Sequence, residues 1–458
     1  MGAKVKLILL SMTLTVVWLS LKLAHFGHSH KHLPQHIKEK LLDVNTWWGP
    51  NQLIGSQDTS IRSFKIKFEE DMVKDLRSRL KNHRPLTPAL EGVAFEYGFN
   101  SGRLDTWIKY WADEYPFAAR EKFLNQYPQF KTNIQGLDIH FIRIKPEVSK
   151  DVEVVPLLLL HGWPGSVREF YEAAPLLTTK TPSGDFTFEL IIPSLPGYGF
   201  SDAAVRPGLD PSQMAVMMRN LMQRLGIKKY YVQGGDAGGL VAALMTTIFP
   251  DEILGFHANL AMVYTPRNIF KIILGSFFPS LVVEPHLADR LYPLSSFFAI
   301  LMEEFGYFHI QASKPDTVGT SLSDSPAGLL AYILEKFSTW TVRNNRHKPD
   351  GGLEAGSRYS RDQLIDNIML YWTSNSITTS MRLYAEANTK KYLALNQIMD
   401  LTAVPTWILQ VKEELLYQTP AMLRAKYERL VNVTVLDDGG HFIAMELPEV
   451  CTFYLQNI

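Results

Sequence analysis

A series of short apolar runs constrains the fold of this chain more than any other feature of its sequence. Most of the runs are rich in Val, Ile and Leu and lack alternation, which indicates strands buried on both faces. Helical stretches such as residues 240–248 separate them, as in a parallel sheet with crossover helices. Residues 140–144 alternate like a further strand. The runs cover residues 154–160, 188–194, 229–233, 255–262, 404–411 and 431–436.

A helical stretch between residues 266 and 395 interrupts this series. Helical spacing of apolar residues is clearest in three places, 296–304, 328–337 and 361–372. The sequence therefore predicts an α/β core in two parts, residues 136–265 and 396–458, with a helical cap inserted at 266–395. Residues 25–135, which contain a predicted helix at 69–80, are expected to form an N-terminal extension that packs on the core.

The segment Gly234-Gly235-Asp236-Ala237-Gly238-Gly239 is the strongest local signal, because it follows a predicted strand and opens a predicted helix. Small residues around one reactive residue are what a nucleophile elbow needs, since larger side chains would collide with the neighbouring strand and helix. A phosphate-binding turn is the alternative, but its G-x-G-x-x-G spacing is absent. Asp236 is therefore the predicted nucleophile.

An aspartate at such an elbow points to one class of reaction. Aspartate attacks a carbon atom by displacement and forms an ester, whose carbonyl carbon water can then attack. A serine in the same place would form an ether, which cannot be cleaved in this way. Asp236 therefore favours alkylating substrates, either epoxides or alkyl halides.

The segment His161-Gly162-Trp163-Pro164-Gly165-Ser166 follows the first core strand directly. Backbone N–H groups of such a loop, at Trp163, can join that of Ala237 in an oxyanion hole for the tetrahedral intermediate of ester hydrolysis. Trp163 and Pro164 are also candidates to bind the substrate. An ordinary glycine- and proline-rich turn is the alternative.

A histidine after the last predicted strand completes the set of reactive groups. His441, in the segment 438–442, is placed to activate water as a general base, and it needs an acid to fix its tautomer. Both Glu413 and Glu414 follow the strand at 404–411 and could supply that acid, although exposed loop carboxylates are the alternative. The order nucleophile, acid, histidine is that of the α/β-hydrolase fold.

The N-terminal segment predicts a membrane anchor at residues 1–24. Residues 7–21 carry no charge, and lysines at the ends can snorkel, so that residues 5–24 approach the roughly 20 residues of a membrane span. A cleaved signal peptide is the alternative, but no small-x-small cleavage site follows. The positive charge is heavier after the segment, which predicts a single-pass protein with a cytosolic catalytic part.

Composition argues against several other classes. The formal net charge is zero, whereas a nucleic-acid-binding protein usually has a basic excess. Cys451 is the only cysteine, so that neither an intrachain disulfide nor a cysteine-based metal site can form. The histidines between residues 25 and 32 are interpreted as a solvated linker, and no metal or cofactor is expected. The sequon at Asn432 falls in a predicted core strand and is interpreted as chance.

Longer motifs run along nearly the whole chain. Besides the anchor they are WWGP at 47–50, GLDIHF at 136–141, HGWPGS at 161–166, PGYGFS at 196–201, KPDTVG at 314–319, EKFSTWT at 335–341 and GHF at 440–442. Together they resemble the microsomal epoxide hydrolases, including the insect juvenile hormone epoxide hydrolases. The resemblance implies an α/β-hydrolase fold with a helical cap and no cofactor. It also implies hydrolysis of lipophilic epoxides to vicinal diols, in the endoplasmic reticulum membrane.

The resemblance also implies roles for individual residues. The family places two tyrosines in the cap that protonate the epoxide oxygen, and by motif these are Tyr307 in GYFHIQ and Tyr384 in MRLYAE. A phenol, with a reference pKa of about 10, can donate this proton without being ionised at neutral pH. By the same resemblance the acid is Glu414, in EELL, rather than Glu413.

The chain departs from the family pattern at Ala237, where relatives carry tryptophan. The backbone N–H is retained, but the loss of the ring is expected to leave a cavity that loosens the aim of Asp236. Two other functions remain open. A haloalkane dehalogenase shares the aspartate elbow but should lack the paired cap tyrosines. A catalytically weak protein that binds hydrophobic ligands is supported only by Ala237.

Overall fold

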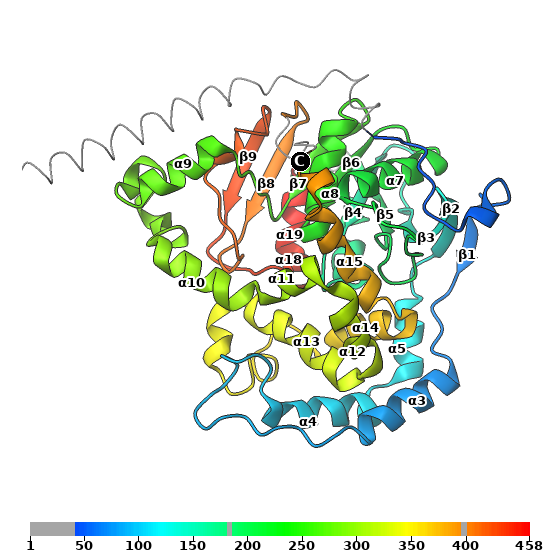
Figure 1. Ribbon diagram of the computed structural model, residues 1–458. Helices are drawn as coiled ribbons and strands as arrows, with labels where there is room; N and C mark the ends of the chain where they lie inside the picture. The colour runs from blue at the N-terminus through cyan, green and yellow to red at the C-terminus, as the bar shows by residue number, and fades with distance from the viewer. Residues whose placement is uncertain (1–41, 181–185, 395–400) are drawn as a thin grey trace, which may run out of the picture.

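A nine-stranded sheet forms the centre of the computed structural model, which describes residues 42–180, 186–394 and 401–458 (Figure 1). The strand order is β1-β2-β3-β5-β4-β6-β7-β8-β9. The pairs β1–β2, β2–β3 and β3–β5 are antiparallel, and all later pairs are parallel. The bounds are β1 Arg62–Phe64, β2 Gln129–Ile134, β3 Leu137–Ile144, β4 Glu153–Leu160, β5 Phe186–Pro193, β6 Tyr230–Gly234, β7 Ile253–Ala258, β8 Thr406–Gln410 and β9 Leu430–Val435.

Each of the six predicted runs overlaps a parallel strand, β4 to β9. Burial on both faces explains the composition of the central ones, since Leu157, Leu158, Leu159 and Leu160 of β4 are all fully buried. Two helix pairs pack on the sheet, α7 with α8 and α6 with α19. The helices of the core are α6 Ala173–Leu177, α7 Pro211–Arg224, α8 Asp236–Ile248, α17 Pro420–Leu423, α18 Ile443–Glu446 and α19 Pro448–Leu455.

Helices fill the interval between β7 and β8, as predicted. We call residues 266–394 the insertion. In Figure 1 its helices α11 to α15 lie below the sheet, at the ends towards which the parallel strands point. Its helices are α9 Pro266–Gly275, α10 Leu294–Glu304, α11 Gly306–Ser313, α12 Pro315–Asp324, α13 Pro326–Thr339, α14 Arg361–Ser374, α15 Ile377–Ala387 and α16 Lys390–Ala394.

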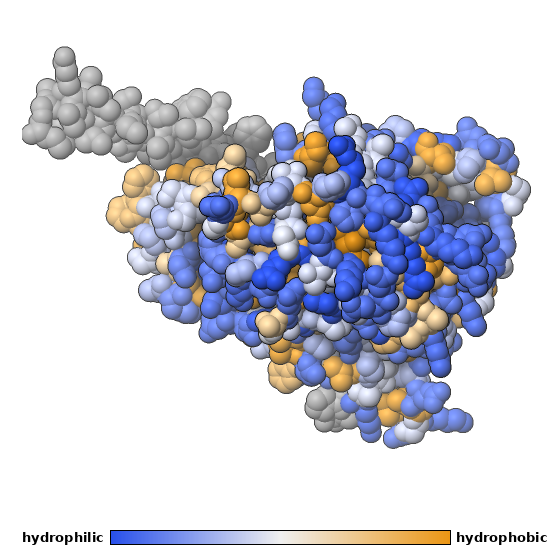
Figure 2. All heavy atoms as spheres, turned by 90° about the horizontal axis from the view of Figure 1, so that it is seen from below, coloured by the Kyte–Doolittle hydropathy of each residue, from blue (hydrophilic) through white to orange (hydrophobic). Residues whose placement is uncertain are grey.

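The N-terminal part packs on the insertion as well as on the core. Its helices α3 (Glu70–Lys81), α4 (Ser101–Lys109) and α5 (Phe117–Leu124) contact α13 or α14. The carboxylate of Asp366 in α14, which is fully buried, accepts hydrogen bonds from the hydroxyl of Tyr115 at 2.8 Å and from Nε of Arg120 at 2.9 Å. Seen from below, where α3 and α4 lie in Figure 1, the surface is mostly hydrophilic (Figure 2). These helices therefore cover the apolar helices of the insertion.

Two further predictions concern the N-terminal segment and the strand around Asn432. The predicted anchor at residues 5–24 and the histidine-rich stretch lie outside the described residues, and no helix of the described part is long and apolar enough to span a membrane. The strand predicted around Asn432 is present as β9, but the expectation that it is buried is wrong. Strand β9 is the edge of the sheet, and Asn432 is exposed on it, because an edge strand has a partner on one side only.

Candidate active site

The turn between β6 and α8 has the geometry expected of a nucleophile elbow. Asp236 has a positive φ of 47°, a strained conformation for a residue other than glycine. A Cβ atom on Gly234 would lie 2.5 Å from the backbone carbon of Gly238, and one on Gly238 would lie 2.2 Å from the carbonyl oxygen of Leu160. Glycine is therefore needed at 234 and 238, because neighbouring backbone atoms leave no room for a Cβ atom at either position.

The loop after β4 reaches the carboxylate of Asp236. The backbone N–H of Trp163 donates to Oδ1 of Asp236 at 2.9 Å, and the backbone N–H of Ala237 donates to the same carboxylate. A Cβ atom on Gly162 would lie 2.4 Å from that of Asp236, so only glycine permits this approach. Burial raises the pKa of Asp236, and the charge of His441 and the two amides offset only part of this rise. The predicted oxyanion donors thus lie together at the nucleophile.

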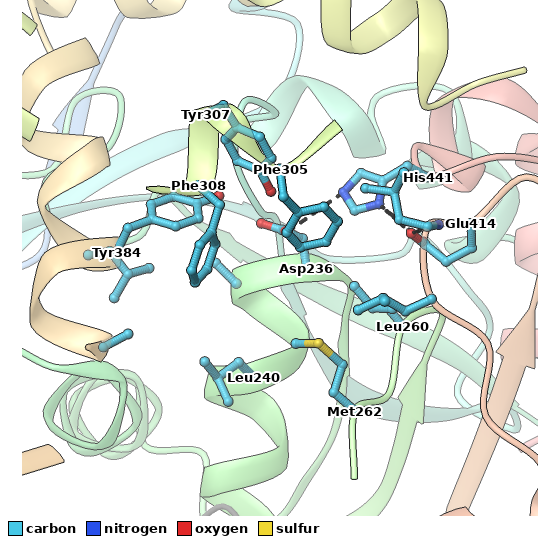
Figure 3. Close-up of a pocket in the computed structure, with 15 residues that line it drawn as sticks. Asp236, Leu240, Leu260, Met262, Phe305, Tyr307, Phe308, Tyr384, Glu414 and His441 are labelled. Carbon is cyan, nitrogen blue, oxygen red and sulfur yellow. Dashed lines mark hydrogen bonds and ion pairs between the residues drawn. The ribbon is translucent and has the colours of Figure 1, made fainter. Parts of the chain in front are cut away.

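His441 and Glu414 form a buried pair beside Asp236 (Figure 3). Nδ1 of His441 lies 3.0 and 3.1 Å from the two carboxylate oxygens of Glu414, and its Nε2 lies 3.8 Å from Oδ2 of Asp236. Burial alone would lower the pKa of His441, but the charges of Glu414 and Asp236, with a smaller contribution from Glu169, outweigh it and raise the pKa to about 9. The resting histidine is therefore an imidazolium ion paired with two carboxylates at neutral pH.

The structure places Glu414, and not Glu413, against the histidine. The side chain of Glu413 instead accepts a hydrogen bond from the backbone N–H of Arg343, at 3.1 Å, in the insertion. The two residues adjoin in sequence, but their side chains contact different partners. Sequence position alone could not distinguish them, whereas the family motif favoured Glu414.

The two cap tyrosines lie on the other side of Asp236 (Figure 3). Tyr307 comes from α11 and Tyr384 from α15, and their ring centres are 5.8 Å apart. The hydroxyls of the two tyrosines interact with each other, so both phenols point into the same part of the site. Burial, and next the negative charge of Asp236, raise the pKa of both phenols well above the ordinary value. Both hydroxyls are thus neutral donors at physiological pH.

These groups share one cavity of about 120 Å³. Asp236, His441, Glu414, Tyr307 and Tyr384 contribute its polar groups. The rest of the wall is apolar, and it consists of Ala237, Leu240, Leu260, Met262, Phe305, Phe308, Leu383, Ala387, Leu415 and Leu416. No cluster of His, Cys, Asp or Glu within residues 42–180, 186–394 and 401–458 could hold a metal ion. The cavity therefore suits an apolar ligand with one polar atom near the two phenols.

Trp163 and Pro164, the predicted substrate contacts, do not line this cavity. The indole of Trp163 is fully buried and stacks on the ring of Tyr307, with centres 5.2 Å apart and an interplanar angle of 6°. The carbonyl of Pro164 accepts a hydrogen bond from Asn367 at 2.8 Å. Trp163 therefore packs against Tyr307, and a hydrogen bond from α14 holds Pro164.

Several residues that hold the site were not predicted from the sequence. In α14, Asn367 accepts a hydrogen bond from the hydroxyl of Ser166 at 2.7 Å, and Tyr371 donates to the carbonyl of Gly165 at 2.7 Å. They brace the loop that carries the oxyanion donor. They belong to no local motif, and the available signal was a polar pair, Asp366 and Asn367, between the apolar residues 364–365 and 368–372 of the predicted helix.

Comparisons with known proteins agree with this geometry. A family model described as "Epoxide hydrolase N terminus" matches residues 61–170, and one for the "alpha/beta hydrolase fold" matches residues 155–448. The chain is 62% identical to juvenile hormone epoxide hydrolase of Bombyx mori over 409 residues, which is 89% of this chain and 88% of that protein. It is 42% identical to epoxide hydrolase 1 of Sus scrofa, over 90% of this chain and 92% of that protein.

Solved structures agree with the sequence relatives. The crystal structure of juvenile hormone epoxide hydrolase from the silkworm Bombyx mori superimposes with a TM-score of 0.89, covering 91% of this chain and 98% of that one at 60% identity. Aspergillus niger epoxide hydrolase gives a TM-score of 0.72 at 26% identity, over 88% of this chain and 97% of that one. With a shared fold and high identity along most of its length, the chain belongs to the epoxide hydrolases of the α/β-hydrolase fold.

Proposed function

We propose that this epoxide hydrolase acts through a covalent ester on Asp236. The observation that carries the proposal is the cavity in which Asp236 faces the phenols of Tyr307 and Tyr384 on one side and His441 on the other. An oxygen of the Asp236 carboxylate attacks a ring carbon, the carbon–oxygen bond of the epoxide breaks, and the released oxygen takes a proton from a tyrosine. The product of this step is a hydroxyalkyl ester.

The second step is hydrolysis of that ester. His441 takes a proton from a water molecule, which attacks the carbonyl carbon of the ester, while Glu414 holds the imidazole in place. The backbone N–H groups of Trp163 and Ala237 stabilise the negative charge on the tetrahedral intermediate. Collapse of this intermediate breaks the bond to the alkyl oxygen, which takes the proton back from His441 and leaves as the vicinal diol. The new carboxylic acid of Asp236 then gives its proton to His441, which restores the resting carboxylate and imidazolium.

The first step prepares His441 for the second. The negative charge of Asp236 contributes to the raised pKa of His441 in the resting enzyme. Esterification removes this charge, so the pKa of His441 falls and the imidazolium gives up its proton, which replaces the proton that the tyrosine donated in the first step. The histidine thus becomes a base when the ester has formed.

The proposed substrates are lipophilic epoxides, either juvenile hormone or foreign arene and alkene oxides. The apolar wall of the cavity supports this class, because burial of apolar substrate surface there is favourable. The paired phenols favour epoxides over alkyl halides, since a halide ion leaves without a proton whereas an epoxide oxygen needs one.

Incubation of the purified protein with juvenile hormone, cis-stilbene oxide and an alkyl chloride tests this function. We expect diols from the epoxides and no release of chloride. Chloride release without diol would indicate a dehalogenase. Binding of the compounds without any product would indicate a ligand-binding protein, and either result would refute the proposal.

Replacement of Tyr307 or Tyr384 by phenylalanine is expected to slow ester formation. Each single variant should lose about tenfold in rate, because the other phenol still donates to the same oxygen. The double variant should lose on the order of 10³-fold, similar to removal of an oxyanion donor. Rapid-quench measurement of ester formation checks this, and full activity of the double variant would place the acid elsewhere.

Replacement of Ala237 by tryptophan is expected to narrow the cavity, because Ala237 lines it beside Leu240 and Met262. The ratio of kcat/KM for cis-stilbene oxide to that for a small aliphatic epoxide should fall at least about tenfold, or about 1.4 kcal/mol. Steady-state kinetics gives the ratio, and the melting temperature reports any overpacking. An unchanged ratio would contradict this prediction.

We also propose that residues 5–24 anchor the protein in the endoplasmic reticulum membrane, with the catalytic part in the cytosol. The uncharged run and the positive charge that follows it support this topology. Alkaline extraction and protease protection of microsomes test it, and release of the protein by alkali would refute the anchor. The proposed division of the chain is 1–24 anchor, 25–135 extension, 136–265 and 396–458 core, and 266–395 cap.

A further inference from the structure

A buried carboxylate holds the backbone on both sides of His441. Oε2 of Glu446 accepts a hydrogen bond from the backbone N–H of Gly440, and Oε1 accepts one from that of Phe442, both at 2.9 Å. The side chain of Glu446 is fully buried. Since the two donors are the residues directly before and after His441, one carboxylate fixes the peptide units that carry the imidazole.

The insertion holds the same loop from the opposite side. The backbone N–H of His441 donates to the carbonyl of Trp340 at 2.9 Å. A Cβ atom on Gly440 would lie 2.6 Å from the carbonyl oxygens of both Trp340 and Thr341. The loop therefore has little room to shift, because the residues that follow α13 contact it as well as Glu446 does.

Arg358 connects Glu446 to the insertion. Its guanidinium lies 3.2 Å from Oε2 of Glu446 and also pairs with Asp438. Asp438 is the first residue of the segment 438–442 that carries His441, which we call the histidine loop. Arg358 belongs to the segment between α13 and α14, so that this ion pair joins the insertion to the core beside the active site.

We propose that Glu446 is a positioning residue for His441, and that the ion pair with Arg358 favours the ionised form of Glu446, which can accept from both amides. The inference rests on the proposed role of His441 in ester hydrolysis. Two N–H groups need two acceptor oxygens, and only an ionised carboxylate supplies both. A protonated acid or an amide would turn a donor towards one of them, which would leave a buried N–H without a partner.

The residues around Glu446 support the roles proposed for Glu446 and Arg358. Burial raises the pKa of Glu446, and Arg358, the two backbone amides and the hydroxyl of Tyr359 offset part of this rise. The resulting pKa is about 7. Asp438 and Tyr359 are the other titratable groups beside Arg358. Below a pH of about 7 Glu446 gains a proton, the contact with one amide is lost, and we expect the hydrolysis step to slow.

The effect should fall on one chemical step. His441 acts in hydrolysis and not in the attack by Asp236, and a misplacement of about 1 Å in a reacting group can cost on the order of 100-fold. Glu446→Gln is therefore expected to slow ester hydrolysis at least about tenfold, with ester formation within about twofold of wild type. The ester should accumulate in the variant.

Single-turnover mixing with cis-stilbene oxide measures both steps, with the ester followed by intact-protein mass and the diol by chromatography. Glu189→Gln is the matched control, because Glu189 also pairs with an arginine, Arg143, at 2.6 Å, but lies on β5 away from the histidine loop. The control should leave both steps unchanged. Equal slowing of both steps by Glu446→Gln, or unchanged hydrolysis, would overturn the inference.

A second variant gives a readout that a merely structural role would not change. Arg358→Gln removes a charge that lowers the pKa of Glu446, so the acidic limb of the pH profile for ester hydrolysis should move to higher pH. This variant decides the question if Glu446→Gln does not fold, and an unmoved limb would overturn the inference. Failure of the wild-type protein to form any ester would instead refute the covalent mechanism.

Discussion

Replacement of Asp236 by alanine is expected to lower kcat for diol formation by on the order of 10⁴-fold or more, the scale of loss when a covalent nucleophile is removed. The described residues offer no other carboxylate at the elbow. The oxyanion donors at Trp163 and Ala237 remain, but they stabilise an intermediate that can no longer form. Steady-state kinetics on cis-stilbene oxide measures the loss.

The same variant should remain folded and should change the titration of His441. Alanine keeps a Cβ atom, so the backbone strain at this position is not increased, and a buried carboxylate with a raised pKa is removed. The negative charge that stabilises the imidazolium is lost, and the pKa of His441 is therefore expected to fall below its value of about 9. NMR titration of the imidazole checks this. Diol formation near the wild-type rate by the folded variant would contradict the mechanism.

Replacement of His441 by glutamine is expected to block the second step alone. Asp236 still attacks, but without a general base the hydrolysis of the ester should slow by about 10²- to 10⁴-fold. Intact-protein mass spectrometry should therefore show the mass of one substrate molecule added to the protein. Glu189→Gln serves again as the control and should show no such accumulation. An inactive variant that stays unmodified would contradict the role given to His441.

Local sequence patterns predicted the turn at Asp236 and the parallel strands, because the fold restricts which residue types can occupy these positions. Gly234 and Gly238 are required because a Cβ atom at either position would lie only 2.5 or 2.2 Å from neighbouring backbone atoms, and this requirement restricts the sequence whatever the rest of the chain does. The central parallel strands were predictable for a similar reason, since burial on both faces favours apolar residues. The run at 255–262 was too long, because β7 ends at Ala258 while the chain stays apolar along the cavity.

Features that depend on distant contacts could not be predicted in this way. Strands β1 and β2 have polar residues. They are stabilised because β1 pairs with β2 and β2 pairs with β3, which no local pattern reveals. Nor does a pattern link Glu446 to the two amides beside His441, or Trp163 to the ring of Tyr307. The cap tyrosines themselves came from family resemblance, since the chain has 19 tyrosines and spacing selects none of them.

Oxygen labelling in a single turnover tests the covalent ester most directly. With enzyme in excess over cis-stilbene oxide in ¹⁸O-labelled water, the label should enter the carboxylate of Asp236, because water attacks the carbonyl carbon of the ester. The first diol should then carry no label, since its new oxygen comes from Asp236. Peptide mass spectrometry locates the label in the protein, and gas chromatography with mass detection measures the diol. A labelled first diol with an unlabelled Asp236 would mean that water attacks the epoxide itself, and would contradict the mechanism.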